Sequence, residues 1–388
     1  MKVLFLTHSY PRRSGDAPGS FILRLARALA DEDVHVHVLA PAGSGAASRE
    51  VLDGIPVQRF RYAPSRFETL AYTGSMAQDV ATSWSARLAL VGYMGADMMQ
   101  TVASRRDLRP DIVHAHWWFP SGVVARVAAR PSRTPLVTTL HGTDVRMARK
   151  VAASRPLFRS VLAASACVTT VSSWLAREVA EMAPGVVPEI APMPVATERF
   201  TPRGSRERAR LLFAGRLNRQ KGLDHLLRAL AAMKQLAMLD VVGEGAEEQS
   251  LKRLASELGV SDRVMWHGQL DQDGLVRMYQ SATALVVPST DEGLGLVAAE
   301  ALLCETPVVA FRSGGLTDIV KHGATGILVN PGDTAELGHA LDSLLSSPEH
   351  ARDLGRAGRS FAAAAFSPET AGRRYADIYR KALERPAS

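Results

Sequence analysis

The sequence predicts an α/β protein with two tandem Rossmann-like domains, each a doubly wound parallel sheet with helices on both faces. Short apolar runs typical of buried strands alternate with amphipathic helical stretches from one end of the chain to the other. The alternation starts again after residue 200, and 388 residues are enough for two domains. These two observations together carry the prediction.

The first half of the chain opens with an apolar run at 2–7, which predicts a strand. A helix is expected at 21–30, because its large apolar residues would then share one face. These residues are Phe21, Ile22, Leu25 and Leu29. Further apolar runs predict strands at 34–41, 111–117, 135–142 and 166–172.

The second half repeats the pattern. Strands are expected at 210–217, 239–245, 263–270, 284–289, 306–311 and 326–330. The segment 183–202 holds five prolines in 20 residues and has no helical period, so it predicts the domain boundary. Ser367 as N-cap and Pro368 at the first helical position predict a last helix to about Leu383, on the second domain or crossing back to the first. The expected parts are 1–190, a linker at 191–202, 203–366, and the last helix within 367–388.

The composition is that of an ordinary globular protein. Hydrophobic residues make up 46% and charged residues 22%, which excludes disordered and collagen-like classes. Cys167 and Cys304 lie far apart in apolar surroundings, so no disulfide framework or cysteine zinc site is expected. The charge-free stretch 88–96 is too short to cross a bilayer, and the N-terminus lacks the charge order of a secretory signal. We therefore expect a cytoplasmic protein.

The net charge is unevenly distributed. Residues 1–200 hold 23 Lys and Arg against 16 Asp and Glu, whereas residues 201–388 hold 23 of each. The whole excess of +7 thus belongs to the first half. Such an asymmetry is typical of a basic face for membrane headgroups, lipid phosphate or nucleic acid, and equally of solvated charge in an arginine-rich protein.

The most informative segment is 289–311, where a strand is followed by a glycine-containing loop and a helix. Glu292 lies in that loop and Glu300 inside the helix. Glycines before a helix let backbone amides approach a phosphate, and the helix N-terminus attracts negative charge. We therefore expect an anion site with the two glutamates on opposite sides of it. The alternative is an ordinary acidic first turn with a solvated Glu300.

Two further turns at strand ends fit the same anion. Arg216 and Lys221 bracket a glycine-flanked loop between a strand and a helix. A guanidinium and an ammonium there can neutralise a diphosphate leaving group without a metal. Gly314 and Gly315 form the third such turn. Ligands of doubly wound sheets bind at strand carboxyl ends, so the three turns predict one phosphate-binding edge.

These motifs resemble the retaining glycosyltransferases of family 4. In the second half the resemblance rests on GRLNRQKG (215–222), the two glutamates separated by seven residues, SGGLTDIV (313–320) and HGATGILVNPGD (322–333). In the first half, SYPRRSGDAPGSFILRLARALA (9–30) resembles the family's acceptor loop and first helix, and TLHGTDV (139–145) its histidine motif. The resemblance covers nearly the whole chain. It implies the GT-B fold with an interdomain cleft, and transfer of a sugar from a nucleotide-diphosphate sugar.

The resemblance also implies roles for single residues. Arg216 and Lys221 would hold the diphosphate, Glu300 the ribose hydroxyls and Glu292 the hydroxyls of the transferred sugar, while His141 would touch the sugar from the first domain. The implied catalytic set is His141, Glu292, Arg216 and Lys221. The implied donor-binding set is Gly215, Arg216, Lys221, Gly243, Gly268, Gly293, Leu294, Gly295, Leu296, Val297 and Glu300. The implied acceptor-side set is Gly19, Ser20, His116 and Asp144.

The implied chemistry needs no metal and no other cofactor. The leaving phosphate takes the acceptor proton on the same face of the sugar, and the protein supplies positioning and charge stabilisation. A covalent intermediate on Glu292 is the weaker alternative. UDP- and GDP-sugars are favoured over ADP-sugars as donors. The acceptor is a hydroxyl compound in glycolipid, lipid-linked or cell-surface polysaccharide synthesis, or else a soluble small molecule or sugar.

Four positions depart from the family's usual pattern. Glu305 and Pro194 stand where glycine is usual, Ser20 replaces the second glycine after Gly19, and Asp318 stands where glutamate is usual. None of these changes removes a charge that the chemistry needs. The last two affect the geometry of the acceptor and phosphate loops.

Other functions explain fewer residues. A nicotinamide-dependent dehydrogenase would use Gly243 and Gly245, but Glu248 stands in place of the third glycine of its fingerprint. A nucleic-acid-binding protein would explain the basic half, but the chain shows no recognition helix or aromatic platform, so no nucleic-acid partner is expected. A non-catalytic nucleotide-sugar-binding protein of the same fold stays an alternative.

A metal-dependent transferase would need an Asp-x-Asp motif at a strand end. The acidic triplets at 31–33 and 271–273 are interpreted as solvated turns instead. His114 and His116 share one face of a strand, but the sequence offers no third metal ligand beside them. The sequence therefore predicts no metal site.

Residues 60–109 offer a candidate surface for a lipid-linked acceptor. Aromatic residues lie beside arginines near its start, and more arginines follow the apolar stretch 88–102. The arginines are Arg59, Arg61, Arg66, Arg105, Arg106 and Arg109. They predict peripheral contact with an anionic membrane at its inner face, with an ordinary helix pair packed on the sheet as the alternative.

Overall fold

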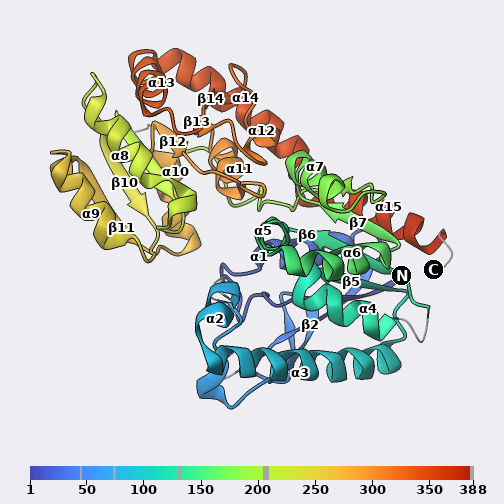
Figure 1. Cartoon of the computed structure of the whole chain (residues 1–388). Helices are drawn as coiled ribbons and strands as arrows, with labels where there is room; N and C mark the ends of the chain where they lie inside the picture. Colours follow the sequence, from blue (N-terminus) through green and yellow to red (C-terminus); the bar gives the residue numbers. More distant parts are fainter. Residues whose placement is uncertain (44–45, 73–75, 130–132, 204–208, 385–388) are drawn as a thin grey trace. The chain divides into compact units, whose positions relative to one another are not determined.

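The computed structural model describes residues 1–43, 46–72, 76–129, 133–203 and 209–384 (Figure 1). The chain divides into two compact units. Unit 1 comprises Met1–Pro194 with Pro368–Ser388, and unit 2 comprises Val195–Ser367. Each unit contains its own sheet with helices packed on it, so the predicted α/β architecture of two Rossmann-like sheets is confirmed.

Unit 1 is built on an eight-stranded sheet in the order β3-β4-β2-β1-β5-β6-β7-β8. Seven strands are parallel, and β3 pairs antiparallel with β4 at one edge. The strands are β1 (Lys2–Leu6), β2 (His35–Pro41), β3 (Arg49–Leu52), β4 (Ile55–Phe60), β5 (Ile112–His116), β6 (Leu136–Leu140), β7 (Cys167–Thr170) and β8 (Glu189–Ile190). The β3–β4 hairpin was not predicted, because β3 is mostly exposed and lacks an apolar run.

The helices of unit 1 cover both faces of this sheet. They are α1 (Ser20–Ala30), α2 (Met76–Thr82), α3 (Trp84–Leu108), α4 (Val123–Ala129), α5 (Thr143–Lys150), α6 (Arg155–Ala163), α7 (Ser173–Met182) and α15 (Pro368–Glu384), with short turns η1 (Ser65–Phe67), η2 (Trp118–Gly122) and η4 (Ala152–Ser154). One apolar core lies between α3 and the sheet, where Ala86, Ala89 and Tyr93 pack with Leu4 and Val113.

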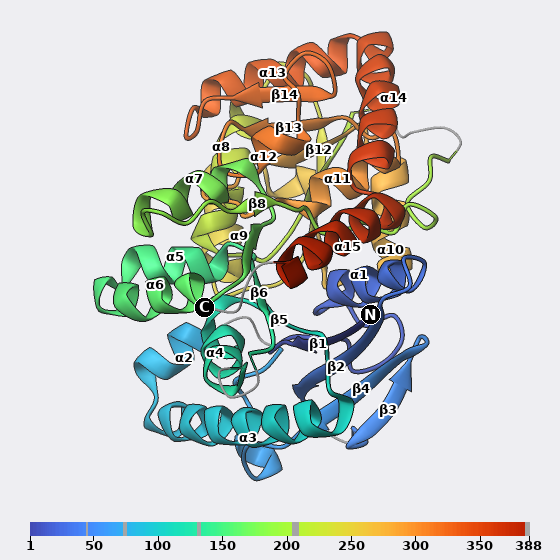
Figure 2. The ribbon, with the colours of Figure 1, turned by 90° about the vertical axis from the view of Figure 1, so that its right-hand side faces the viewer.

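The last helix, α15, belongs to unit 1 and packs along α1 (Figure 2). Gly372 lets the two helices approach closely, because a Cβ there would lie 2.6 Å from the carbonyl oxygen of Ala28. Tyr379 Oη lies 2.8 Å from His114 Nδ1, and Tyr375 Oη donates to the carbonyl of Ala191 at 3.1 Å. The helix thus covers a buried part of the sheet that lies more than 170 residues away along the chain.

Unit 2 is built on a six-stranded parallel sheet in the order β11-β10-β9-β12-β13-β14. The strands are β9 (Arg210–Ala214), β10 (Met238–Val242), β11 (Val264–Gly268), β12 (Ala284–Val287), β13 (Val308–Phe311) and β14 (Gly326–Val329). The helices are α8 (Leu223–Ala232), α9 (Glu248–Glu257), α10 (Gln272–Ser281), α11 (Leu296–Leu303), α12 (Leu316–Ile319), α13 (Thr334–Ser346) and α14 (Pro348–Ala365), with turns η5 (Arg219–Lys221) and η6 (Ser261–Arg263).

The order of strands in unit 2 reverses between β9 and β12. Counted from the first strand of the unit, it is the 3-2-1-4-5-6 order of dinucleotide-binding sheets, in which ligands bind at the point of reversal. Unit 1 reverses in the same way between β1 and β5. Each sheet therefore has one edge where loops from two diverging halves leave room for a ligand.

The described residues also show the state of the two cysteines and the character of the helices. Cys167 and Cys304 are both buried, and neither forms a disulfide. Across the part of the chain that the structure describes, no helix combines the length and apolar character that crossing a bilayer requires.

Candidate active site

The site in unit 2 lies where its strand order reverses. The loop after β9 carries Gly215, Arg216 and Lys221, and the loop after β12 carries Glu292. These two strands are neighbours in the sheet, pairing through Leu211 and Leu212. The fold therefore brings together two motifs that are about 70 residues apart in the sequence.

Lys221 and Glu292 form an ion pair across this point. Lys221 Nζ lies 2.6 Å from Glu292 Oε2, and the two side chains are only 20% and 14% exposed. Asn218 positions the lysine, because its side chain accepts a hydrogen bond from the Lys221 amide at 3.2 Å and caps the η5 turn. The pair holds an ammonium and a carboxylate at a fixed place. Partial burial lowers the local dielectric there, which strengthens the electrostatic interactions of both groups.

The loop that carries Glu292 is fixed on both sides. The backbone carbonyl of Glu292 accepts a hydrogen bond from the Gly315 amide at 2.8 Å. Gly314 has φ +60°, and a Cβ there would collide with the Glu292 carbonyl, so only glycine permits this approach. On the other side, Gln220 Nε2 donates to the Asp291 carbonyl at 3.2 Å. The three turns predicted from the sequence are therefore one connected structure.

Glu300 lies one helix further into unit 2. It projects from α11 and accepts a hydrogen bond from Tyr279 Oη at 3.0 Å. Burial, and then the nearby carboxylate of Glu300, raise the pKa of Tyr279 well above its usual value, so the phenol stays protonated and donates. Tyr279 was not predicted as a site residue, because it comes from α10 and meets Glu300 only in the fold.

The other predicted donor-side residues surround the same turns. Gly295 is the N-cap of α11, and Leu296 and Val297 form its first turn. Gly293 and Leu294 are buried in the loop, while Arg216 is exposed directly after β9. Gly268 ends β11 at φ +64°, and Gly243, at φ +128°, passes so close to Gly215 that a Cβ would collide with its carbonyl. Gly243 thus serves close packing between loops, not a dinucleotide fingerprint.

The site in unit 1 lies at the carboxyl ends of β1, β5 and β6. We call it the histidine–aromatic cluster, and it consists of His8, Phe21, His116, Trp117 and His141. The Trp117 ring lies 4.1 Å from His8 and 4.3 Å from His141 between centroids, and Phe21 lies 5.3 Å from His141. His8, Phe21 and Trp117 were not predicted. Two adjacent aromatic residues, Trp117 and Trp118, were the available signal, but the partners of Trp117 come from helix α1 and from the ends of other strands.

His116 and His141 are hydrogen bonded to each other. Nδ1 of His116 lies 3.2 Å from Nε2 of His141, so one ring donates and the other accepts. Burial, reinforced by the neighbouring histidines, lowers both pKa values well below 6.5. Two neutral imidazoles are therefore held side by side, with His116 fully buried and His141 half-buried.

Asp144 orients the His141 loop from beneath. It is buried, and its carboxylate accepts the backbone amides of His141 at 3.2 Å, Gly142 at 2.9 Å and Trp118 at 3.3 Å. Burial raises the pKa of Asp144 to about 6, while those backbone hydrogen bonds oppose the rise. Asp144 is thus placed as a positioning residue for the loop.

Gly19 and Ser20 begin α1. Gly19 is its N-cap at φ +72°, and a Cβ there would collide with the Ser9 carbonyl, so the loop from β1 folds tightly over the helix start. Ser20 is half-buried at the first helical position. The next residue, Phe21, carries this turn into the histidine–aromatic cluster.

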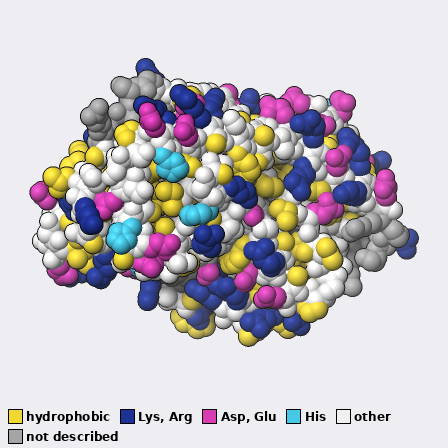
Figure 3. All heavy atoms as spheres, turned by 90° about the horizontal axis from the view of Figure 1, so that it is seen from above, with side chains coloured by type: hydrophobic (Ala, Val, Ile, Leu, Met, Phe, Trp, Pro, Cys, Tyr) yellow, Lys and Arg dark blue, Asp and Glu magenta, His cyan; other side chains and the backbone are white. Residues whose placement is uncertain are grey.

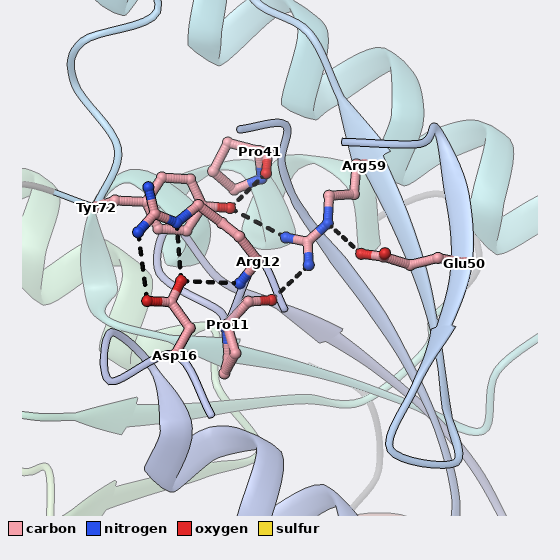
Figure 4. A network of polar contacts seen from close by, with 7 residues as sticks. All are labelled: Pro11, Arg12, Asp16, Pro41, Glu50, Arg59 and Tyr72. Atoms are coloured by element: carbon pink, nitrogen blue, oxygen red, sulfur yellow. Dashed lines mark hydrogen bonds and ion pairs between the residues drawn. The ribbon is translucent and has the colours of Figure 1, made fainter. Parts of the chain in front are cut away.

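A buried arginine network fixes the loop before α1 (Figure 4). Arg59 donates to Glu50 Oε1 at 2.6 Å, to Tyr72 Oη at 3.1 Å and to the Pro11 carbonyl. Arg12, in the same loop, pairs with Asp16 at 2.8 Å and lies over the Tyr72 ring. The prediction that Arg59 belongs to an exposed basic face is wrong, because its side chain is 0% exposed.

The rival motifs occupy structural roles. Residues 31–33 form the turn after α1, and Asp271 caps α10 by accepting the Gly274 amide at 2.7 Å. His114 lies between Tyr379 Oη at 2.8 Å and Thr139 Oγ1 at 2.7 Å. Within the described ranges, no group of three or more His, Cys, Asp or Glu side chains is arranged to hold a metal ion.

Two family models match the chain, one in each half. The model described as "Glycosyl transferase 4-like domain" matches residues 17–196, and "Glycosyl transferases group 1" matches residues 196–361. The chain is also similar to the D-inositol 3-phosphate glycosyltransferase of Streptomyces bingchenggensis (strain BCW-1). The two are 32% identical, over 95% of this chain and 86% of that protein.

Solved structures share the fold. Sucrose-phosphate synthase from Thermosynechococcus elongatus superposes with a TM-score of 0.83 at 23% identity, covering 99% of both chains. Anabaena Alr3699/HepE in complex with UDP-glucose gives a TM-score of 0.73 at 20% identity, covering 98% of this chain and 99% of that one. A relative above 30% identity spans nearly the whole chain, and family models match both halves. The chain therefore belongs to the retaining group 1 glycosyltransferases of family 4, which have the GT-B fold.

Proposed function

We propose that this nucleotide-sugar glycosyltransferase transfers a sugar from a nucleotide-diphosphate sugar to a hydroxyl acceptor, with retention of configuration and without a metal. The observation that carries the proposal is the Lys221–Glu292 pair, 2.6 Å long, where the strand order of unit 2 reverses. A cation held at this edge suits a diphosphate leaving group. A carboxylate beside it suits the hydroxyls of the sugar.

Each donor-side residue has a distinct role in this proposal. Lys221 and Arg216 would neutralise the charge that develops on the departing diphosphate, and Glu292 would orient the transferred sugar. Glu300, held by Tyr279, would bind the ribose hydroxyls. The solved complex of the Anabaena protein with UDP-glucose supports a UDP-sugar as the first donor to test, with GDP-sugars next and ADP-sugars last.

In unit 1, the neutral His141, held by the fully buried His116 at 3.2 Å, would bind a sugar or acceptor hydroxyl without competing for the acceptor proton. Their lowered pKa values keep both rings uncharged at neutral pH. The proton would pass to the leaving phosphate on the same face. The protein's share would be positioning and charge stabilisation.

Two acceptor classes follow from different observations. The relative from Streptomyces is named for D-inositol 3-phosphate, which favours a soluble polyol phosphate. The exposed apolar face of α3, described below, favours a hydroxyl carried on a lipid. The first acceptor is anionic and the second would lie at an anionic membrane, in keeping with the excess of +7 in residues 1–200.

A donor screen followed by a transfer assay tests the proposal. Binding of the correct donor should raise the unfolding temperature of the protein, since a ligand that binds only the native state stabilises it. With that donor, transfer to D-inositol 3-phosphate or to a lipid-linked alcohol should give a product with the donor's anomeric configuration, seen by NMR. Activity should survive EDTA. An inverted product, or activity lost to EDTA and restored by magnesium or manganese, would contradict the mechanism.

A further inference from the structure

Helix α3 carries large apolar side chains on its outer face. Trp84, Leu88, Val91 and Met99 are 76%, 70%, 71% and 67% exposed. Their successive spacings of four, three and eight residues place them in one row along the helix. A Cβ at Gly95, between Val91 and Met99 in that row, would meet nothing within 4 Å. We call this row the α3 stripe.

The inner face of α3 carries polar residues beside the apolar ones that pack on the sheet. Among its buried residues are Asp97, Thr101 and Ser104, and Thr101 Oγ1 donates to Asp97 at 3.2 Å. The outer face of a surface helix in a soluble protein is usually polar or charged, so the exposed apolar row is the unusual feature of α3. Figures 1 and 2 both show α3 along the outside of unit 1. The α3 stripe therefore has the composition of a surface that a partner covers.

Arginines surround the stripe. Arg87 lies over the Trp84 ring at 4.9 Å, and Arg106 and Arg109 are exposed at the other end of the helix. The neighbouring η1 turn adds Arg66, which lies over the half-exposed Phe67 ring at 4.8 Å. The exposed acid on α3 is Asp107. Apolar and aromatic side chains flanked by arginines are the arrangement of helices that lie in a membrane interface.

We infer that the α3 stripe docks unit 1 on a bilayer surface that carries anionic headgroups. The charges decide between this occupant and a second copy of the chain. Two copies paired through the stripe would bring the arginines of both together, whereas anionic headgroups neutralise them. On the face in Figure 3, by contrast, Lys and Arg are interspersed with Asp and Glu. This inference does not rest on the proposed reaction.

Flotation of the full-length protein with vesicles tests the inference. Wild type should float with phosphatidylglycerol-containing vesicles at low salt, and less so as salt rises. The stripe variant, with Leu88→Gln, Val91→Gln and Met99→Gln, should lose at least about tenfold in partitioning, because apolar area no longer enters the interface. Glutamine keeps helix propensity, and these three positions are mostly exposed in the fold.

A charge variant separates the electrostatic part. Arg66→Gln with Arg106→Gln should lower partitioning by roughly fivefold per arginine, the equivalent of about 1 kcal/mol each, and flatten the salt dependence. The matched control, Arg27→Gln with Arg177→Gln, removes two exposed arginines from α1 and α7 of the same unit. It should leave partitioning within about twofold of wild type. An unchanged unfolding temperature shows that each variant is folded.

Three outcomes would overturn the inference. The first is a wild type that does not float with anionic vesicles at low salt. The second is equal flotation of wild type and stripe variant. The third is a dimer in analytical ultracentrifugation that the stripe variant abolishes, without vesicle binding, since the stripe would then be covered by a second copy. Donor binding is measured on every sample, so failure of the proposed reaction is seen separately.

Discussion

Lys221 and Glu292 show that the energetic contribution of an ion pair depends on its place in the fold. A second pair, Lys252 with Glu248 on α9, has the same 2.6 Å separation, but its side chains are 47% and 37% exposed. Exposed pairs of this kind contribute little, whereas the charges of a partly buried pair are screened less by solvent. The two pairs therefore give a matched comparison.

We expect Lys221→Ala to lower kcat by roughly 100-fold or more, because one preorganised cation is lost from the leaving group. Lys252→Ala should leave kcat within about twofold of wild type, because that pair is solvent-exposed. Steady-state kinetics with the donor found in the screen measures both. Equal kcat in the two variants would remove Lys221 from the catalytic set.

At the residue scale, the sequence predicted which residues follow strand ends better than it predicted the burial and the partners of polar side chains. Lys221, Glu292 and Gly314 could be predicted to lie close together because they follow strand ends, and strand ends converge in a parallel sheet. Tyr279 was missed, because it reaches Glu300 from another helix. Arg59 was misjudged, because its partner Glu50 lies on an edge strand without an apolar pattern. Burial of a polar side chain depends on contacts that local periodicity does not contain.

At the scale of an element, the two loops on either side of α12 show that the effect of a glycine depends on what lies beside it. Gly314 and Gly323 both have positive φ, at +60° and +75°. A Cβ at Gly314 would collide with the Glu292 carbonyl, whereas a Cβ at Gly323 would meet nothing within 4 Å. Alanine at either position costs about 1–2 kcal/mol of backbone strain, but only one of the two displaces Glu292.

Gly314→Ala should therefore lower kcat/KM by roughly 10- to 100-fold, the effect of a small misplacement at a reacting centre. Gly323→Ala should lose comparable stability and keep kcat/KM near the wild-type value. Thermal unfolding and steady-state kinetics on both variants separate strain from misplacement. A loss of kcat/KM shared by both would mean that the Glu292 loop does not depend on this contact.

Helix α3 contains a buried acid that makes unit 1 sensitive to pH. Burial raises the pKa of Asp97 to about 7 from an unfolded value of 3.8. The folded protein thus binds this proton more tightly than the unfolded chain. The stability that the protonated carboxyl contributes is complete below about pH 4 and is lost as pH rises through about 7.

We expect the free energy of unfolding of wild type to fall, relative to Asp97→Asn, by roughly 2–4 kcal/mol between pH 4 and pH 8. Asparagine has the same shape and does not titrate. Asp107→Asn, at an exposed position of the same helix, should run parallel to wild type. Urea unfolding at each pH gives the curves. Parallel curves for Asp97→Asn and wild type would show that the carboxyl is ionised in the fold.

At the scale of the whole molecule, the two sheets were predictable and the path of the chain between the units was not. Apolar runs of strand length recur along both halves, and the sheet class follows from that recurrence. The placement of α15 depends on Tyr375, Tyr379 and Gly372 meeting residues far away in the sequence. Its amphipathic pattern would suit either unit equally well.

Separating the chain tests this placement. Residues 195–367 contain a complete six-stranded sheet and should fold alone. Residues 1–194 lack the helix that covers His114 and should unfold without a cooperative transition. Coexpression with residues 368–388 should restore the transition, measured by circular dichroism. A cooperative transition of residues 1–194 alone, unchanged by the added segment, would contradict the structural role of α15.

The return of α15 also sets an order of events during synthesis. The ribosome releases all of residues 195–367 before the last helix of unit 1 emerges. Domains generally fold as units as they leave the ribosome, the N-terminal one first. Here the order of completion is reversed, since the unit that begins first is finished last. A message broken before codon 368 would therefore yield a chain with unit 2 intact and the surface around His114 uncovered, a substrate for proteases and chaperones.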